Sequence, residues 1–253
     1  MNSFLHRIAD AVLRGTELQY FPVRVRGQLA TGARWTLYPA SAYWRGTPEP
    51  SVGHALLSLG DLTGKCCWDL GSHYGYYSVA LAKLTGPTGQ VVAVEPFAPN
   101  YTRLERHRRM NTLTRLKIYQ CAASNATGSA EFFTDVSEGD TSVHLAHEGE
   151  VRTTTTSTTS VRTVRLDELV ERNEIRPPDF MKVDVEGHGH HALGGANESI
   201  RRSRSIILMD FHSPQEVAGT KSILDPLGYR WEPLEPNPPE NCIGCDFFLR
   251  PSL

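Results

Sequence analysis

The sequence lacks a long hydrophobic run, a marked excess of charge of one sign, and a large set of cysteines. No run of about 18 apolar residues occurs among its 253 residues, so we expect no membrane-spanning helix and no membrane partner. The formal net charge is −2 and the isoelectric point is about 6.6. Because non-specific nucleic-acid binding normally needs a basic face, the sequence disfavours RNA or DNA as a partner.

The five cysteines are an odd number, which argues against a framework of disulfide bonds. Cys242 and Cys245 form one CxxC pair, and no second pair completes a zinc site. Residues 1–15 carry apolar residues at helical spacing that charged residues interrupt, which predicts a short amphipathic helix rather than a secretory signal. These features together predict a cytoplasmic protein.

From Lys65 onward, apolar runs of strand length alternate with helical patterns, which indicates a parallel sheet covered by helices on both faces. The expected helices cover residues 74–84, 100–111, 188–200 and 214–227. The expected strands cover residues 65–70, 90–95, 116–123, 180–184 and 205–210, followed by an antiparallel pair at 229–234 and 245–250. This order predicts an α/β fold whose mainly parallel seven-stranded sheet has an antiparallel final strand.

Two regions lie outside this alternation. Residues 1–50 are predicted to form an N-terminal extension of helix and strand on the substrate side of the main domain, which comprises residues 51–253. The polar stretch near 136–162 contains a threonine run with no core pattern, so we expect a solvent-exposed loop or edge there. Its length is typical of a lid or substrate loop.

A strand that runs into a glycine-bearing turn and then a helix predicts a nucleoside-binding loop at Trp68-Asp-Leu-Gly-Ser-His-Tyr-Gly75. Gly71 allows a sharp turn, and Gly75 allows the start of the helix to pack close to the sheet. The second strand ends in Glu95, where a carboxylate can accept hydrogen bonds from both ribose hydroxyls of a cofactor. The candidate cofactor-binding residues are Asp69, Gly71, Ser72, His73, Gly75, Glu95, Pro96, Ala123 and Asp184.

Two features favour S-adenosylmethionine over a dinucleotide as the cofactor. A pyrophosphate needs G-x-G-x-x-G with bare amides and no nearby anion. Here Asp69 lies two residues before Gly71, and His73 replaces the middle glycine. Asp69 would repel a pyrophosphate but suits the cationic methionine part of S-adenosylmethionine. A nicotinamide or flavin cofactor, and a turn that binds no cofactor, are the alternatives.

Several motifs, in order, resemble the FkbM family of methyltransferases over about residues 42–251. They are Trp68-Asp-Leu-Gly-Ser-His-Tyr-Gly75, Val94-Glu-Pro96, Cys121-Ala-Ala-Ser-Asn125, Val164-Arg-Leu-Asp167, Met181-Lys-Val-Asp-Val-Glu-Gly187 and Leu208-Met-Asp-Phe-His212. The resemblance implies a class I methyltransferase (Rossmann-like) fold and methylation of a hydroxyl on a sugar, polyketide or other small metabolite. The chain departs from the family where a G-A-E turn is usual, because Gly189 replaces the glutamate and three histidines surround it. His73 stands where the family often has asparagine.

The candidate catalytic residues are Asp184, Glu186 and His212. Asp184 and Glu186 are alternate residues at the end of a strand, so their side chains should point the same way, and His212 follows the neighbouring strand. In one assignment His212 is the general base and the two acids hold the acceptor. In another, a divalent metal binds Asp184, Glu186 and one or more of His188, His190 and His212, but we favour no metal. A third assignment is structural: the acids cap the next helix.

We therefore predict an S-adenosylmethionine-dependent methyltransferase, most simply an O-methyltransferase whose partner is a small-molecule acceptor. A second hypothesis is an RNA or protein methyltransferase of the same fold. A third is a relative that binds a nucleoside ligand without catalysis.

Overall fold

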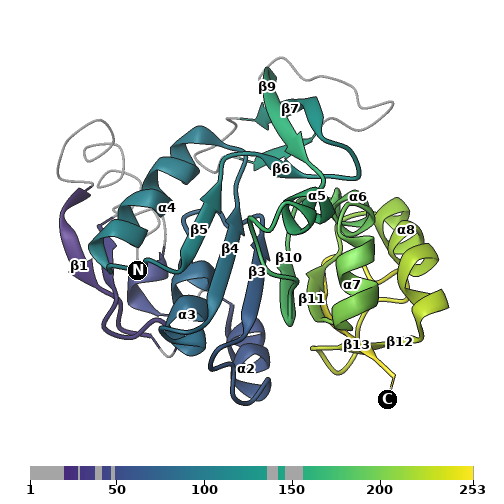
Figure 1. Cartoon of the computed structure of the whole chain (residues 1–253), viewed down its shortest axis with the longest axis horizontal. Coiled ribbons are helices and arrows are strands. Elements are labelled where there is room, and N and C mark those ends of the chain that lie inside the picture. Colours follow the sequence, from purple (N-terminus) through teal and green to yellow (C-terminus); the bar gives the residue numbers. More distant parts are fainter. Residues whose placement is uncertain are drawn as a thin grey trace.

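The computed structural model describes residues 20–27, 29–37, 42–46, 49–135, 142–145 and 156–252. A seven-stranded sheet in the order β12-β13-β11-β10-β3-β4-β5 forms its centre (Figure 1). Its strands are β3 (Cys66–Leu70), β4 (Gln90–Val94), β5 (Leu116–Tyr119), β10 (Phe180–Val183), β11 (Ile206–Asp210), β12 (Tyr229–Pro233) and β13 (Asp246–Pro251). Strands β11, β10, β3, β4 and β5 are parallel, whereas β13 is antiparallel to both of its neighbours. The predicted α/β fold with an antiparallel final strand is confirmed.

Helices cover both faces of this sheet because the side chains of each strand alternate between them. Cys66, Trp68 and Leu70 of β3 pack in one buried cluster with α5–α8, whereas Cys67 packs in the other with α2–α4. The helices are α2 (Pro50–Ser58), α3 (Tyr76–Thr85), α4 (Ala98–Met110), α5 (Leu166–Glu171), α6 (Gly189–Gly194), α7 (Asn197–Ser203) and α8 (Pro214–Leu224), with 3₁₀ turns η2 (Ala42–Arg45) and η4 (Asp225–Leu227). None of the helices within the described ranges is long and apolar enough to cross a membrane.

The predicted helix over residues 188–200 is wrong as one continuous element, because it divides into α6 and α7. A new helix start needs acceptors for its free backbone N–H groups, and the buried Asp167 carboxylate of α5 supplies them. It accepts hydrogen bonds from the backbone N–H groups of Glu198 (3.0 Å) and Ser199 (2.9 Å). Asp167 therefore caps α7 from a distance rather than the helix in which it lies.

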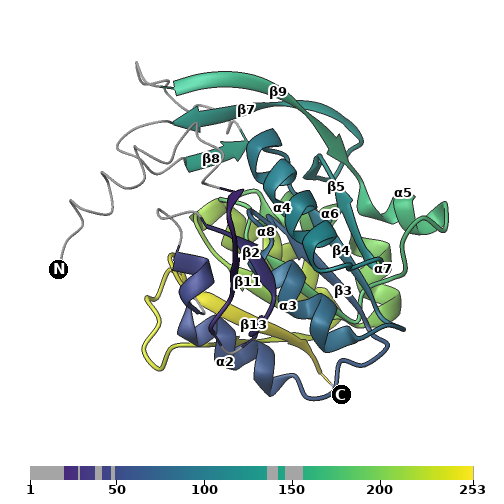
Figure 2. The ribbon, with the colours of Figure 1, turned by 90° about the vertical axis from the view of Figure 1, so that its left-hand side faces the viewer.

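The predicted strand over residues 116–123 and the predicted polar loop after it also differ from the structure. The chain breaks after β5, and β6 (Ala122–Ala123) joins a second sheet with β7 (Gly128–Asp135), β8 (Ser142–Leu145) and β9 (Thr156–Val164) in the order β6-β9-β7-β8. The end of the threonine run is thus a strand, since it pairs with β7. The predictions for residues 136–141 and 146–155 lie outside the described residues. Figure 2 shows β7 and β9 as a long curved ribbon at the edge of the molecule.

The N-terminal extension packs on α4 through a hairpin of β1 (Pro22–Arg24) and β2 (Arg34–Thr36). Trp35 of β2 stacks on His107 of α4 with ring centroids 3.5 Å apart. His107 Nε2 lies 2.8 Å from the Thr36 hydroxyl, and burial lowers the pKa of His107 to about 3. This contact holds β2 against α4 of the main domain. The helix predicted at residues 1–15 lies outside the described residues.

Candidate active site

The glycine-bearing turn connects the carboxyl end of β3 to α3. Gly71 and Gly75 have φ values of +80° and +84°, a conformation that residues with a side chain rarely adopt. A methyl group at position 71 would overlap the backbone carbonyl of Asp184, which follows β10. A methyl group at position 75 would overlap the side chain of Leu104. Gly75 therefore lets the start of α3 lie against Leu104 of α4, and Gly71 brings the turn against Asp184. The helix α3 also contacts β3 and β4 of the sheet.

Alanine at position 71 should be much more destabilising than alanine at position 60. Gly60 has a similar φ of +77°, but nothing lies within 4 Å of its added methyl group, so Gly60→Ala should cost only about 1 kcal/mol of strain. Gly71→Ala adds a steric overlap with backbone and should cost about 3 kcal/mol or more. Denaturant unfolding of both variants measures the difference. Equal losses of stability would show that the turn does not lie against Asp184.

Glu95, directly after β4, has a buried carboxylate that organises this turn. Its Oε2 accepts a hydrogen bond from the backbone N–H of His73 (2.7 Å), and its Oε1 accepts one from that of Phe97 (2.9 Å). Burial raises the pKa of Glu95 to about 7 against the opposing effect of these hydrogen bonds. Each carboxylate oxygen can accept more than one hydrogen bond, so the group retains capacity for ribose hydroxyls.

Asp69 lies inside β3 and is almost fully buried. Its Oδ2 accepts a hydrogen bond from the hydroxyl of Ser78, whereas its buried Oδ1 has no hydrogen-bond partner among the described residues. Burial raises the pKa of Asp69, although Lys182 and Ser78 oppose this effect. An unsatisfied buried carboxylate oxygen fits a cationic or hydrogen-bond-donating ligand.

The other predicted cofactor residues lie around the same turn or beside it. The Ser72 hydroxyl donates to the carbonyl of Asp69 (2.6 Å) and thereby closes the turn. His73 has a φ of +50°, and its Nδ1 lies 3.1 Å from the hydroxyl of Tyr43 in the N-terminal extension. Pro96 follows Glu95 and is partly buried, and Ala123 is buried in β6. Their contacts with a cofactor stay predictions.

His212 lies among carboxylates from two strand ends. Its Nε2 lies 3.5 Å from Glu186 Oε2, 3.8 Å from Asp184 Oδ1 and 3.5 Å from Asp210 Oδ2. Asp184 and Glu186 follow β10, and Asp210 ends the adjacent parallel strand β11. The structure therefore brings the three predicted catalytic residues together. It also places Asp210 beside them. Asp210 stands two residues before His212, as Asp184 stands two residues before Glu186, so the same alternation was a signal for it in the sequence.

The pKa of His212 reflects these neighbours. Burial alone would lower it, but the carboxylates of Glu216, Asp210, Glu186 and Asp184 raise it to about 9. The imidazole is therefore mostly protonated near pH 7 when the site holds no other cation. Only its neutral form can accept a proton, and that form increases as the pH rises.

Lys182 is the buried cation of this cluster. Its Nζ donates to Asp184 Oδ2 at 2.9 Å and lies 4.9 Å from the centre of the Tyr77 ring. Burial opposes the charged form, yet Asp184 and Asp69 raise the pKa of Lys182. Lys182 in turn lowers the pKa of Asp184 against the effect of burial. Lys182 thus connects the carboxylate of the cofactor loop with the carboxylate beside His212.

Asp184, Asp210 and His212 could also hold a divalent cation, because one ligand atom from each lies within 4.8 Å of the others. Of the residues predicted as metal candidates, Glu186 and His188 are not part of this group. His188 Nε2 instead lies 3.1 Å from the hydroxyl of Ser124. The rings of His188, His190 and His191 lie close to one another and are partly buried.

Glu216 and Glu49 are the contributions that sequence reasoning missed. Glu216 of α8 is fully buried and accepts a hydrogen bond from the backbone N–H of His212 (2.8 Å). Glu49, just before α2, accepts a hydrogen bond from the Tyr77 hydroxyl (2.6 Å). The spacing of Glu216, four residues after His212, was the only signal in the sequence, and it does not distinguish a buried acid from an exposed one.

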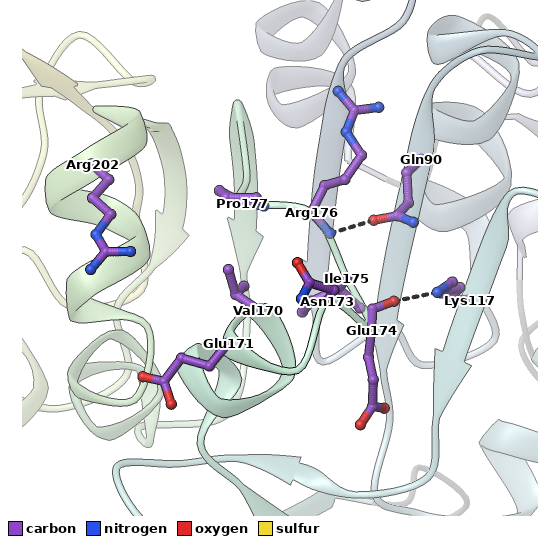
Figure 3. A pocket seen from close by; sticks show the side chains of 10 residues that line it. All are labelled: Gln90, Lys117, Val170, Glu171, Asn173, Glu174, Ile175, Arg176, Pro177 and Arg202. Carbon is purple, nitrogen blue, oxygen red and sulfur yellow. Dashed lines mark hydrogen bonds between the residues drawn. The ribbon is translucent and has the colours of Figure 1, made fainter.

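A separate surface pocket of about 480 Å³ lies among Gln90, Lys117, Val170, Glu171, Asn173, Glu174, Ile175, Arg176, Pro177 and Arg202 (Figure 3). Gln90 begins β4 and Pro177 precedes β10, so this pocket is at the amino ends of the parallel strands. Ligands of open α/β sheets bind at the carboxyl ends, where Glu95, Asp184 and His212 lie. The pocket in Figure 3 is therefore not the candidate active site.

The chain is similar to known proteins. A family model described as "Methyltransferase FkbM domain" matches residues 69–230, which is more than half of the chain. The protein named "Hexuronic acid methyltransferase AglP", from Haloferax volcanii, is 26% identical over 193 residues, which are 73% of this chain and 74% of that protein.

The chain is also similar to solved structures, among them the following two. A candidate rRNA methylase from Clostridium thermocellum matches with a TM-score of 0.51 and 12% identity over 82% of this chain and 98% of that one. The methyltransferase FkbM from Methylobacillus flagellatus matches with a TM-score of 0.49 and 20% identity over 73% of this chain, which spans only 43% of that structure. The strand order and the first of these matches confirm the predicted class I methyltransferase fold.

Proposed function

Because the chain belongs to the FkbM methyltransferase domain family and is thus an S-adenosylmethionine-dependent methyltransferase, we propose that it methylates a hydroxyl group of a small metabolite. One observation carries this proposal. The Nε2 atom of His212 faces three carboxylates at the strand ends, directly beside the turn that Gly71 forms. A base in this place can remove the proton of an acceptor hydroxyl.

The cofactor residues fit their proposed roles in charge and position. When bound, S-adenosylmethionine supplies a methyl group on a positively charged sulfur. Glu95 accepts hydrogen bonds from its ribose, and Asp69 has an unsatisfied buried oxygen near that turn. Backbone contacts of the turn with Asp184 keep the cofactor residues and the acceptor residues in one rigid unit.

The residues that face the methyl acceptor have two roles, binding its hydroxyl groups and removing a proton. Asp184, held by Lys182, and Glu186 accept hydrogen bonds from acceptor hydroxyl groups. His212 takes the proton from the hydroxyl that is methylated, and the surrounding carboxylates stabilise the imidazolium that forms. Alignment of the acceptor oxygen by these groups supplies much of the rate, since methyl transfer to oxygen is a displacement between two oriented partners.

A sugar is the first acceptor class to test, because the relative from Haloferax volcanii is named for a hexuronic acid. We expect methyl transfer from labelled S-adenosylmethionine to hydroxyl groups in a panel of hexoses, hexuronic acids and their glycosides. Turnover should be unchanged by EDTA, since His212 is proposed as a base and not as a metal ligand. Loss of turnover in EDTA, restored by a divalent metal, would instead assign Asp184, Asp210 and His212 as ligands.

The other hypotheses have distinct outcomes in the same experiment. Transfer to RNA or to protein, with none to small molecules, would assign a macromolecular acceptor. Tight binding of S-adenosylhomocysteine without transfer to any acceptor would assign a non-catalytic relative. Either result would contradict the proposed small-molecule O-methyltransferase.

A further inference from the structure

Tyr43 of η2 connects the N-terminal extension to the cofactor turn. Its hydroxyl lies 3.1 Å from Nδ1 of His73, the central residue of that turn. We propose that Tyr43 is a positioning residue for S-adenosylmethionine, since it holds His73 and, through it, the carboxylate of Glu95. The proposal rests on the cofactor assignment above and is independent of the identity of the methyl acceptor. It gives the N-terminal extension a role on the cofactor side of the site.

His73 needs support from its surroundings because of its backbone conformation. Its φ of +50° lies in the left-handed region, which is unfavourable for a residue with a side chain. In this conformation its backbone N–H donates to Glu95 Oε2 at 2.7 Å. If the turn relaxed to a more favourable conformation, that N–H would leave the carboxylate proposed to accept the ribose hydroxyls. The contact of the imidazole with Tyr43 opposes this change, so it keeps more of the protein in the binding-competent state.

Aromatic packing holds Tyr43 in place. The Tyr43 ring stacks on Tyr76 of α3, with centroids 5.6 Å apart and planes 27° from parallel, and it lies 6.2 Å from the ring of Trp35. Trp35 and Tyr76 are almost fully buried, and Trp35 also stacks on His107 of α4. Closely packed rings of this kind allow little rearrangement. The Tyr43 hydroxyl therefore has a fixed position beside the turn.

A second residue of the extension lies over the same part of the sheet. Glu49 accepts a hydrogen bond from the Tyr77 hydroxyl at 2.6 Å, and the Tyr77 ring lies 4.9 Å from Lys182 Nζ. Lys182 is the register partner of Asp69 on the neighbouring strand, so their side chains share one face of the sheet. The extension therefore packs on the face that carries the Asp69 carboxylate, and Tyr43 belongs to the same cluster of packed side chains.

The test compares Tyr43→Phe with Tyr229→Phe. Tyr43→Phe removes the hydroxyl but keeps a ring that can stack on Tyr76. Tyr229 is the matched control, because its hydroxyl donates to the backbone carbonyl of Ser205 at 2.8 Å, just before the amino end of β11. Both variants should unfold at a lower temperature, since each loses a hydrogen bond. Only Tyr43→Phe should weaken S-adenosylhomocysteine binding, by about fivefold in isothermal titration calorimetry.

A double-mutant cycle tests whether Tyr43 acts through His73. His73→Ala removes the imidazole, so adding Tyr43→Phe to this variant should not weaken binding further. His73→Asn keeps a polar atom on Cγ, where the imidazole has Nδ1, and asparagine tolerates a positive φ. In that background Tyr43→Phe should again weaken binding. With an acceptor that the wild-type protein methylates, Tyr43→Phe should raise KM for S-adenosylmethionine about fivefold while kcat stays within about twofold.

Three results would overturn the proposal, and they can be told apart. Wild-type affinity in Tyr43→Phe, with binding lost in Glu95→Ala, would remove the positioning role and leave the cofactor assignment intact. An equal effect of Tyr43→Phe in the wild-type protein and in His73→Ala would show that the hydroxyl does not act through the imidazole. Wild-type affinity in Glu95→Ala would contradict the cofactor assignment itself, and the role of Tyr43 with it.

Discussion

Glu95→Ala should weaken binding of S-adenosylhomocysteine about 100-fold or more. Hydrogen bonds to a charged group contribute about 1.5–3 kcal/mol each, and the variant loses the ribose contacts together with the two backbone contacts that shape the turn. Isothermal titration calorimetry measures the change directly. Because the pKa of Glu95 is raised to about 7, affinity in the wild-type protein should increase as the pH rises through 7 and the carboxylate ionises.

Glu232→Ala is the matched control for this experiment. Glu232 is a half-exposed glutamate that pairs with Arg250 at 3.0 Å. It belongs to the edge strand β12, which four strands separate from β4 and Glu95. Its removal should leave affinity unchanged, since an exposed ion pair of this kind contributes little. Asp69→Ala should also lose binding, although part of its effect will come through Lys182. If Glu95→Ala and Asp69→Ala both bind S-adenosylhomocysteine with wild-type affinity, the cofactor assignment is contradicted.

His212→Ala should lower kcat by about 10²–10⁴-fold with little change in S-adenosylhomocysteine binding. The variant removes the group that takes the acceptor proton but leaves the cofactor turn intact, since Asp69 and Glu95 hold that turn by hydrogen bonds. Glu186→Gln is a useful partner variant: it keeps a hydrogen-bond acceptor beside Nε2 but removes one charge, so its effect should be smaller. Equal kcat values for His212→Ala and the wild-type protein would contradict the base role.

The pH dependence of the wild-type enzyme tests the same role with a definite sign. A general base acts in its neutral form, so kcat/KM for the acceptor should rise with pH as His212 loses its proton. The ascending limb should lie above the ordinary histidine pKa of 6.5 and no higher than about 9, since the positive charge of the bound cofactor lowers the pKa of His212. His212→Ala should lack this limb. A kcat/KM for the acceptor that does not change from pH 6 to 9 would contradict the base role of His212.

The site residues at the carboxyl ends of the parallel strands could be predicted from the sequence, because the alternation of side chains along a strand determines which of them face the same way. Strands of a parallel sheet place their ends on one edge, and alternate residues share a face. Asp184, Glu186 and His212 follow from this rule, and Asp210 follows from it equally well. The seven-stranded fold was predictable for the same reason, since its buried strands are continuous apolar runs.

The contributions that could not be predicted depend on long-range packing. Nothing local distinguishes Glu216 from an exposed helical glutamate, because only the fold places it beside Gly189. The cap of α7 comes from Asp167, some thirty residues away, so the break between α6 and α7 has no nearby polar signal. The end of the threonine run becomes β9 only because β7 supplies a partner strand.

A crystal structure with S-adenosylhomocysteine bound tests the central claim most directly. The account predicts the ribose hydroxyls within hydrogen-bonding distance of Glu95, and the sulfur on the side of the turn that faces Asp184 and His212. A ligand held instead at the amino ends of the strands, among the residues of Figure 3, would contradict the account, as would a ribose that makes no contact with Glu95.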